Sequence, residues 1–192
     1  MRNDPEPSKP FAAVVIVRPR TDHGWTIRPF RPEDAGHLSK IYRAAVRTLA
    51  TRSYNFDQIA AWLSIAPESK DIAAIYEAGR TALVCESNGM PIGFSDHDAA
   101  GHIRFLYCHP DHARRGVAGG LLEALETSAQ NARISSLTSE ASETALPVFT
   151  WHGFRMVERR EFVVSGVTLH NYAVEKRLLP ISPTASRKDP LS

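Results

Sequence analysis

The chain has 192 residues, enough for one domain whose hydrophobic core needs no disulfide or metal support. Its formal net charge is only +2 and its basic residues do not form one block, which argues against a dedicated nucleic-acid-binding protein. No apolar stretch has the length of a membrane span, and no signal-peptide cleavage pattern is present. We therefore expect a cytoplasmic protein with no nucleic-acid and no membrane partner.

The two ends of the chain differ in composition from its middle. Residues 1–10 are polar and contain prolines, and residues 180–192 combine prolines with serines, so both are expected to be loose ends. The apolar segment 11–17 is short, and an extra strand, an interface segment or an inconsequential extension all remain open for it. We expect an N-terminal extension over residues 1–23, one domain over 24–178 and a tail over 179–192.

The first part of the domain predicts one strand followed by three helices. The strand is expected over residues 25–29, and Pro32 with two acidic residues after it is typical of a helix start. Asn55 is a suitable N-cap for a short second helix. A third helix is expected over residues 69–78, ended by Gly79.

The rest of the domain predicts strands interrupted by two helices. Asn88-Gly89 between two apolar runs is a strong hairpin signal, and Ser165-Gly166 is a second turn signal. The predicted strands cover residues 81–86, 90–94, 102–108, 135–139, 154–164 and 168–174, and the predicted helices follow Gly116 and cover residues 144–152. Cys85 and Cys108 both lie in these apolar runs, so we expect free thiols in a reducing compartment.

The most informative segment covers residues 106–122, which read as an apolar strand, a proline stop, a basic glycine-containing loop and the start of a helix. A helix N-terminus leaves its first N–H groups unpaired and carries a partial positive charge, which suits a phosphate. Gly116, Ala118 and Gly119 let an anion approach the backbone, and Arg114 and Arg115 add matching donors. This order predicts a pyrophosphate-binding site.

Residues 113–118 resemble the acetyl-CoA loop of the GCN5-related N-acetyltransferases (GNAT), usually Gln/Arg-x-x-Gly-x-Gly/Ala. Ala113 replaces the leading Gln/Arg, whereas Gly116 and Ala118 fit the spacing. Residues 151–154 resemble the family's helix-ending Gly-Phe signature, and residues 137–149 resemble a segment shared by small stand-alone bacterial members. Other phosphate loops fit worse, because neither Gly-x-x-x-x-Gly-Lys-Ser/Thr nor Gly-x-Gly-x-x-Gly opening a βαβ unit is present.

The resemblance covers residues 25–178 and implies an α/β (α+β) fold of the GNAT acyl-CoA N-acyltransferase type, with a central mixed, mostly antiparallel sheet flanked by helices. It implies an N-acetyltransferase that moves the acetyl group of acetyl-CoA directly to a primary amine of a small molecule or protein. No metal is expected. In the family, the strand before the loop splays from the next strand and binds the pantetheine arm. The implied donor-site residues are Leu106, Tyr107, Cys108, Arg114, Arg115, Gly116, Val117, Ala118 and Gly119, with Phe149 as a wall for the CoA arm.

The catalytic side chains are less clear from the resemblance. The family's usual general acid is a tyrosine at the position that Phe149 occupies here, and its usual base is a carboxylate on the strand before the loop, where this chain has none. The remaining candidates for proton transfer are His97, His102, Tyr107 and Glu140, with Asp96 and Thr150 also nearby in the sequence.

Several alternatives remain open. The missing tyrosine and carboxylate allow a degenerate CoA-binding or sensing module, and another acyl-CoA could be the donor. Cys108 could take the acetyl group first, although its position favours packing. Arginines on the first helices, among them Arg52, either read an acidic acceptor or form a solvated face. The acceptor is not identified, and either the last hairpin or segment 11–17 could pair two copies into a homodimer.

Overall fold

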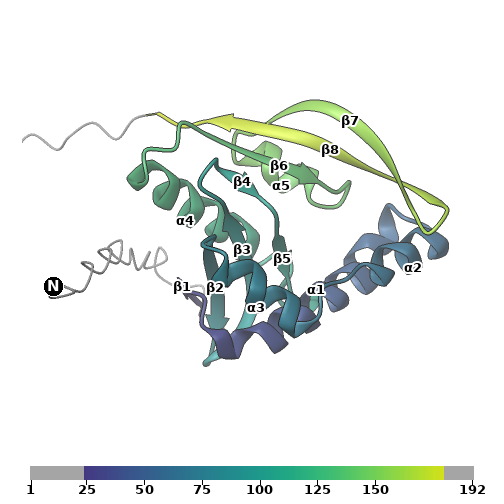
Figure 1. The fold of residues 1–192 in the computed structure, drawn as a ribbon, viewed down its shortest axis with the longest axis horizontal. Helices are drawn as coiled ribbons and strands as arrows, with labels where there is room; N and C mark the ends of the chain where they lie inside the picture. The colour runs from purple at the N-terminus through teal and green to yellow at the C-terminus, as the bar shows by residue number, and fades with distance from the viewer. Residues whose placement is uncertain (1–23, 180–192) are drawn as a thin grey trace, which may run out of the picture.

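The computed structural model describes residues 24–179 (Figure 1). The expectations for the N-terminal extension, the apolar segment 11–17 and the tail beyond residue 179 lie outside these residues. The described chain forms an α+β fold, as predicted, and its strands are divided between two four-stranded sheets. Within residues 24–179, none of the helices combines the length and the apolar character needed to cross a membrane.

The first sheet is antiparallel throughout and has the order β1-β2-β3-β5. Its strands are β1 (Thr26–Pro29), β2 (Thr81–Ser87), β3 (Met90–His97) and β5 (Leu106–Cys108). The predicted hairpin between β2 and β3 is confirmed. Asn88 and Gly89 have φ of 50° and 77°, as a tight two-residue turn between twisted strands requires.

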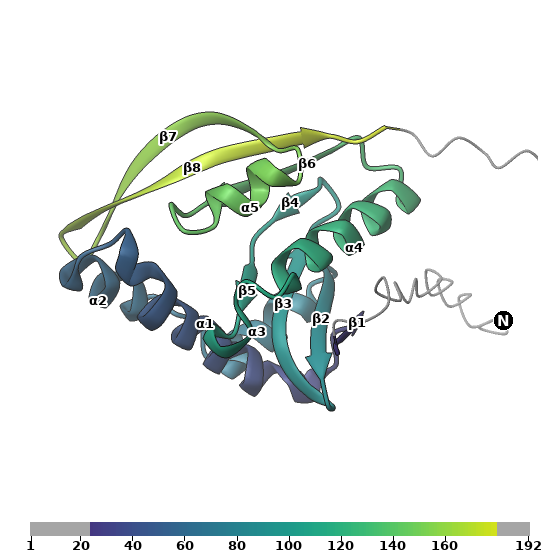
Figure 2. The ribbon, with the colours of Figure 1, turned by 180° about the vertical axis from the view of Figure 1, so that it is seen from behind.

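Helices cover both faces of this sheet (Figures 1 and 2). The helices are α1 (Ala35–Leu49), which follows a short 3-10 turn at Pro32–Asp34, then α2 (Phe56–Ser64), α3 (Ser69–Glu77) and α4 (Val117–Asn131). The N-cap role of Asn55 is confirmed, because its side chain accepts a hydrogen bond from Gln58 N. Two hydrophobic clusters result, one between α1, α3 and the sheet and one between α4 and the opposite face.

The second sheet has the order β4-β6-β8-β7, with β4 and β6 parallel and the other pairs antiparallel. Its strands are β4 (His102–Ile103), β6 (Ser136–Ala141), β8 (Val167–Arg177) and β7 (Arg155–Val164), and α5 (Leu146–Trp151) lies between β6 and β7 in the chain. The predicted turn at Ser165-Gly166 is confirmed, since both residues have positive φ. The long β7–β8 hairpin reaches across to α2 (Figure 1), where Gln58 Nε2 donates to the Thr168 carbonyl.

The prediction of one strand over residues 102–108 is wrong. Residues 102–108 do not form a single strand but divide into β4 and β5, which belong to different sheets. The cause is Asp96, which is fully buried and whose Oδ1 accepts hydrogen bonds from the backbone N–H groups of Arg104 and Phe105, at 2.9 and 3.0 Å. A side chain thus replaces the strand partner at these two residues, and the sheets part there.

Two serine hydroxyls complete the division. Ser95 Oγ donates to the Phe105 carbonyl and Ser139 Oγ to the Ile103 carbonyl, at 2.6 and 3.0 Å. Asp96 is itself fixed by Arg80, whose Nε lies 2.8 Å from Oδ2. These contacts satisfy buried backbone groups that a continuous strand would otherwise pair with its neighbours.

Replacing Asp96 with alanine should therefore be severely destabilising. The substitution leaves two backbone N–H groups and the Arg80 guanidinium without their buried acceptor, and we expect the free energy of unfolding to fall by about 3–5 kcal/mol. Urea denaturation followed by circular dichroism measures the loss. Asp111→Ala, at a side chain that is 83% exposed, is the control and should change stability by less than about 0.5 kcal/mol. Equal stability of the two variants would contradict this role for Asp96.

Candidate active site

The edge of β5 opposite β3 is open within the described chain. His109 N donates to the Ile92 carbonyl, and the pairing of Tyr107 with Phe94 continues this contact with β3. Because alternate residues of an antiparallel strand face opposite neighbours, the main-chain groups of Leu106 and Cys108 point away from β3. Within the described part of the chain, β5 pairs with β3 alone. Its outer edge therefore offers unpaired donors and acceptors to a ligand.

The N-terminus of α4 lies just beyond this edge. Gly116 is the N-cap residue and has φ of 81°, a conformation that favours glycine. The first bond of the helix runs from Gly120 N to the Gly116 carbonyl, so the N–H groups of Val117, Ala118 and Gly119 precede the helical ladder. Gly119 also leaves room for the His152 ring, because a Cβ there would lie 2.6 Å from His152 Nε2 unless that ring shifted. These three donors are arranged to bind an anion.

A cavity of about 520 Å³ joins the open edge to the helix N-terminus. This volume is typical of small-molecule sites. Its walls come from the C-terminal half of α1 and the turn after it, from Trp62 of α2, from β5, from the loop and first turn of α4, and from the segment leading into α5. The lining residues are Ala45, Val46, Thr48, Leu49, Ala50, Arg52, Trp62, Leu106, Tyr107, Cys108, Ala113, Arg114, Gly116, Val117, Ala118, Gly119, Ser142, Thr144, Ala145, Pro147 and Val148.

The cavity brings together every predicted donor-site residue except Arg115 and Phe149. Arg115 is exposed, and its carbonyl accepts a hydrogen bond from Trp25 Nε1. Phe149 is 1% exposed and packs edge-on against Phe154, with ring centroids 5.0 Å apart. The wall expected from Phe149 is instead formed by its neighbours Pro147 and Val148.

Tyr107 is the one predicted proton-transfer residue that lines the cavity. Its ring lies against Tyr42, with centroids 4.4 Å apart, and stacks on Phe94. Burial raises the pKa of Tyr107 well above its ordinary value of 10. The phenol therefore stays protonated at neutral pH and can act as a hydrogen-bond donor rather than a base.

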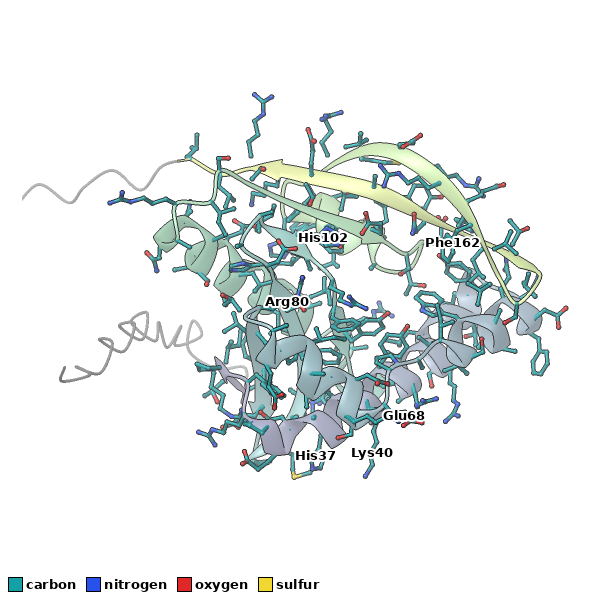
Figure 3. The ribbon with its side chains drawn as sticks, in the orientation of Figure 1. His37, Lys40, Glu68, Arg80, His102 and Phe162 are labelled. Carbon is teal, nitrogen blue, oxygen red and sulfur yellow. The ribbon has the colours of Figure 1, made fainter. Side chains whose placement is uncertain are left out.

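The structure places the predicted histidines and Glu140 elsewhere. His97 is 2% exposed, and its two ring nitrogens contact the Asp98 carbonyl and Ser128 Oγ. His102 and Glu140 are brought together, with Nε2 and Oε2 3.2 Å apart, but neither lines the cavity. Figure 3 shows His102 near Arg80, which donates to the His102 carbonyl at 2.6 Å.

The thiol of Cys108 borders the cavity but is poorly suited to attack a thioester. Its Sγ lies 3.4 Å from the His109 carbonyl, to which it can donate. Burial raises the pKa of Cys108 to about 12. Since the thiolate is the nucleophilic form, a thiol that remains protonated through the physiological range is unreactive.

A second polar cluster lies beside the cavity wall. The resemblance implied an acceptor pocket near Tyr54, but Glu143, His170 and Tyr172 were not predicted from the sequence. Glu143 Oε2 accepts hydrogen bonds from His170 Nε2 at 3.1 Å and from the Tyr172 hydroxyl at 2.5 Å. The Tyr54 hydroxyl donates to the His170 carbonyl and accepts from Glu143 N, both at 3.0 Å. The only local signal was the alternation of His170 and Tyr172 along one face of a strand. Among residues 24–179, no group of three histidine, cysteine or acidic side chains could hold a metal ion.

Comparisons with known proteins agree with this architecture. The family model of the acetyltransferase (GNAT) domain matches residues 50–176. The uncharacterized N-acetyltransferase YafP of Escherichia coli (strain K12) is 34% identical over 146 residues, which cover 76% of this chain and 91% of YafP. A GCN5-related N-acetyltransferase structure from Rhodopseudomonas palustris superposes with a TM-score of 0.74 at 31% identity, covering 87% of this chain and 100% of that one.

More distant structures share the fold. That of yncA from Salmonella typhimurium, solved with its cofactor acetyl-CoA, has a TM-score of 0.66 at 22% identity and covers 84% of this chain and 99% of its own. The chain therefore belongs to the GNAT acetyltransferase family, as its sequence motifs suggested. It is an acyltransferase of that family, and the cavity between β5 and α4 is its candidate active site.

Removal of the Cys108 thiol should leave acetyl transfer largely intact. Because the raised pKa keeps the thiol protonated, we expect Cys108→Ala to retain kcat with a general amine acceptor within about threefold, since direct attack needs no protein thiolate. In the parent enzyme, iodoacetamide should also alkylate Cys108 only slowly below pH 9. A loss of more than a hundredfold, or an acetyl group trapped on Cys108 in intact-mass spectra, would contradict the assignment.

Proposed function

We propose that this enzyme transfers the acetyl group of acetyl-CoA directly to a primary amine of a small molecule or protein. The observation that carries the proposal is that an unpaired strand edge and a free helix N-terminus open into one cavity. The first matches the amide-rich pantetheine arm and the second matches the pyrophosphate of the same donor. The yncA structure, which holds acetyl-CoA, supports the choice of donor.

The roles of the donor-site residues follow from their positions. The main-chain groups of Leu106 and Cys108 bind the pantetheine arm, and the N–H groups of the first turn of α4 bind the pyrophosphate. Arg114, which lines the cavity, adds a charged donor for the phosphate oxygens. A main-chain N–H beside the thioester carbonyl stabilises the negative charge that develops there as the amine attacks.

The chain contributes to transfer mainly by positioning. No histidine, aspartate or glutamate is among the residues that line the cavity in the described chain, so the proposal does not include His97, His102 or Glu140 as proton acceptors. Holding the amine and thioester together is itself a large rate effect, and the amine can release its proton to water. Tyr107 stays in the proposal as a hydrogen-bond donor at the cavity wall. The cytoplasmic location and the homodimer remain predictions.

Thermal denaturation in the presence of acetyl-CoA tests the donor site. A ligand at 100 times its dissociation constant adds roughly 2.7 kcal/mol to the stability of the native state, so a clear rise in Tm is expected for the parent protein. Arg114→Ala should weaken acetyl-CoA binding about tenfold through loss of a charged phosphate donor. Arg133→Ala, an exposed arginine beyond the far end of α4, is the matched control and should bind as the parent does.

A folded protein with no change in Tm at millimolar acetyl-CoA would overturn the donor assignment. Binding of acetyl-CoA without release of free CoA thiol in the presence of any primary amine would favour the alternative, a CoA-sensing module. Turnover with a longer acyl-CoA alone would change the identity of the donor.

A further inference from the structure

The cluster around Glu143 is continuous with the cavity wall. Glu143 stands between Ser142 and Thr144, which both line the cavity. Tyr54 lies edge-on to Trp62, another lining residue, with ring centroids 5.2 Å apart, and it stacks on His170 at 5.1 Å. The cluster therefore adjoins the wall of the proposed donor site, where Trp62 of α2 and the segment around Ser142 and Thr144 line the cavity.

The Glu143 carboxylate is held at one oxygen and open at the other. Its Oε2 accepts from both His170 and Tyr172, whereas Oε1 has no hydrogen-bond partner among residues 24–179. The Glu143 side chain is 41% exposed, so water or a ligand can reach it. A fixed carboxylate with one free oxygen is a preorganised acceptor for a charged N–H donor.

The side chains near this carboxylate include one arginine and several aromatic rings. The charge of Arg159 helps to lower the pKa of Glu143. Tyr54 and Tyr172 contact Glu143 through their hydroxyls, and the Trp62 ring lies edge-on to the Tyr54 ring. The negative faces of such rings attract ammonium groups, and the carboxylate supplies the full charge that the rings lack. The residues that line the adjacent cavity include no carboxylate in the described chain, so Glu143 is a carboxylate next to a wall that has none.

The carboxylate is suited to holding a cation and not to taking a proton from one. Hydrogen bonds, first from Tyr172 and then from His170, lower the pKa of Glu143 below its ordinary value of 4.5. A carboxylate with a lowered pKa stays ionised at neutral pH but is a weak base. A protonated nitrogen cannot attack a thioester, and a weakly basic carboxylate does not take its proton. The Glu143 carboxylate therefore suits a nitrogen other than the one that is acetylated.

We propose that Glu143, held by His170 and Tyr172 beside the rings of Tyr54 and Trp62, binds a second, positively charged nitrogen of the acceptor. The acceptor is then a diamine or another amine with a separate cationic centre. The assignment rests on the proposed function, because it places one end of the acceptor while the other end meets the acetyl group.

Two amines of equal chain length test this assignment. 1,5-Diaminopentane carries a second ammonium at the position where 1-aminohexane ends in a methyl group. With acetyl-CoA as donor, the parent enzyme should use the diamine with a kcat/KM about tenfold above that of the monoamine, the size of effect expected for one charge-assisted hydrogen bond. Glu143→Gln should bring the ratio close to one while the KM for acetyl-CoA is unchanged. Glu123→Gln, at an exposed position of α4, should keep the parent's ratio.

The variant should fold, because a glutamine oxygen can still accept from His170 and Tyr172, and an unchanged Tm shift with acetyl-CoA verifies it. If it does not fold, Tyr172→Phe, which releases one of the donors that fix the carboxylate, should lower the ratio in the same direction. Equal use of the two amines by the parent, a preference for the monoamine, or no acetylation of either while acetyl-CoA binds would overturn the assignment. Failure of the parent to bind acetyl-CoA would instead overturn the proposed function.

Discussion

The buried carboxylate of Asp96 is the constraint on which the rest of the structure depends. By accepting the backbone N–H groups of Arg104 and Phe105, it ends one strand and starts another at the same point of the chain. β4 then joins β6 while β5 stays with β3. The two sheets part beyond this junction, and within residues 24–179 the outer edge of β5 is left without a strand partner. The cost of interrupting a sheet is offset because side chains satisfy the interrupted backbone.

The open edge becomes a site because a helix N-terminus stands at its end. The chain leaves β5 through Pro110, turns, and enters α4 after its N-cap Gly116. The partial positive charge of the helix N-terminus and the N–H groups of its first turn therefore lie next to the end of β5. Arg114 adds a full charge on the same side. An extended, amide-rich arm fits the open edge of β5, and phosphates at its end fit the N-terminus of α4. The proposed donor site is thus built mostly from main-chain groups, which would tolerate the replacement of the family's usual leading residue by Ala113.

The parts of the fold that the sequence predicted depend on neighbouring residues. Turns at Asn88-Gly89 and Ser165-Gly166, the Asn55 cap and the loop before α4 are each specified within a few residues. The division of residues 102–108 was not predictable in this way, because Asp96 acts on backbone groups eight and nine residues away. The burial of His97 and the pairing of His102 with Glu140 likewise depend on how strands pack.

The acceptor side was the least predictable part of the site. Tyr54, Glu143 and His170 are separated in the chain by 89 and 27 residues, and only the approach of the β7–β8 hairpin to α2 brings them together. The proposed donor site, by contrast, lies mostly within one continuous segment, which explains why its residues could be named from the sequence while Glu143 and His170 could not.

The central claim is that the outer edge of β5 binds the donor. Amide hydrogen exchange of the protein, followed residue by residue with NMR in the presence and absence of acetyl-CoA, tests it most directly. The account predicts that the amides of Leu106 and Cys108 become protected when acetyl-CoA binds, while the amide of Tyr107, already directed at β3, changes little. Unaltered exchange at Leu106 and Cys108 in a protein saturated with acetyl-CoA would contradict it.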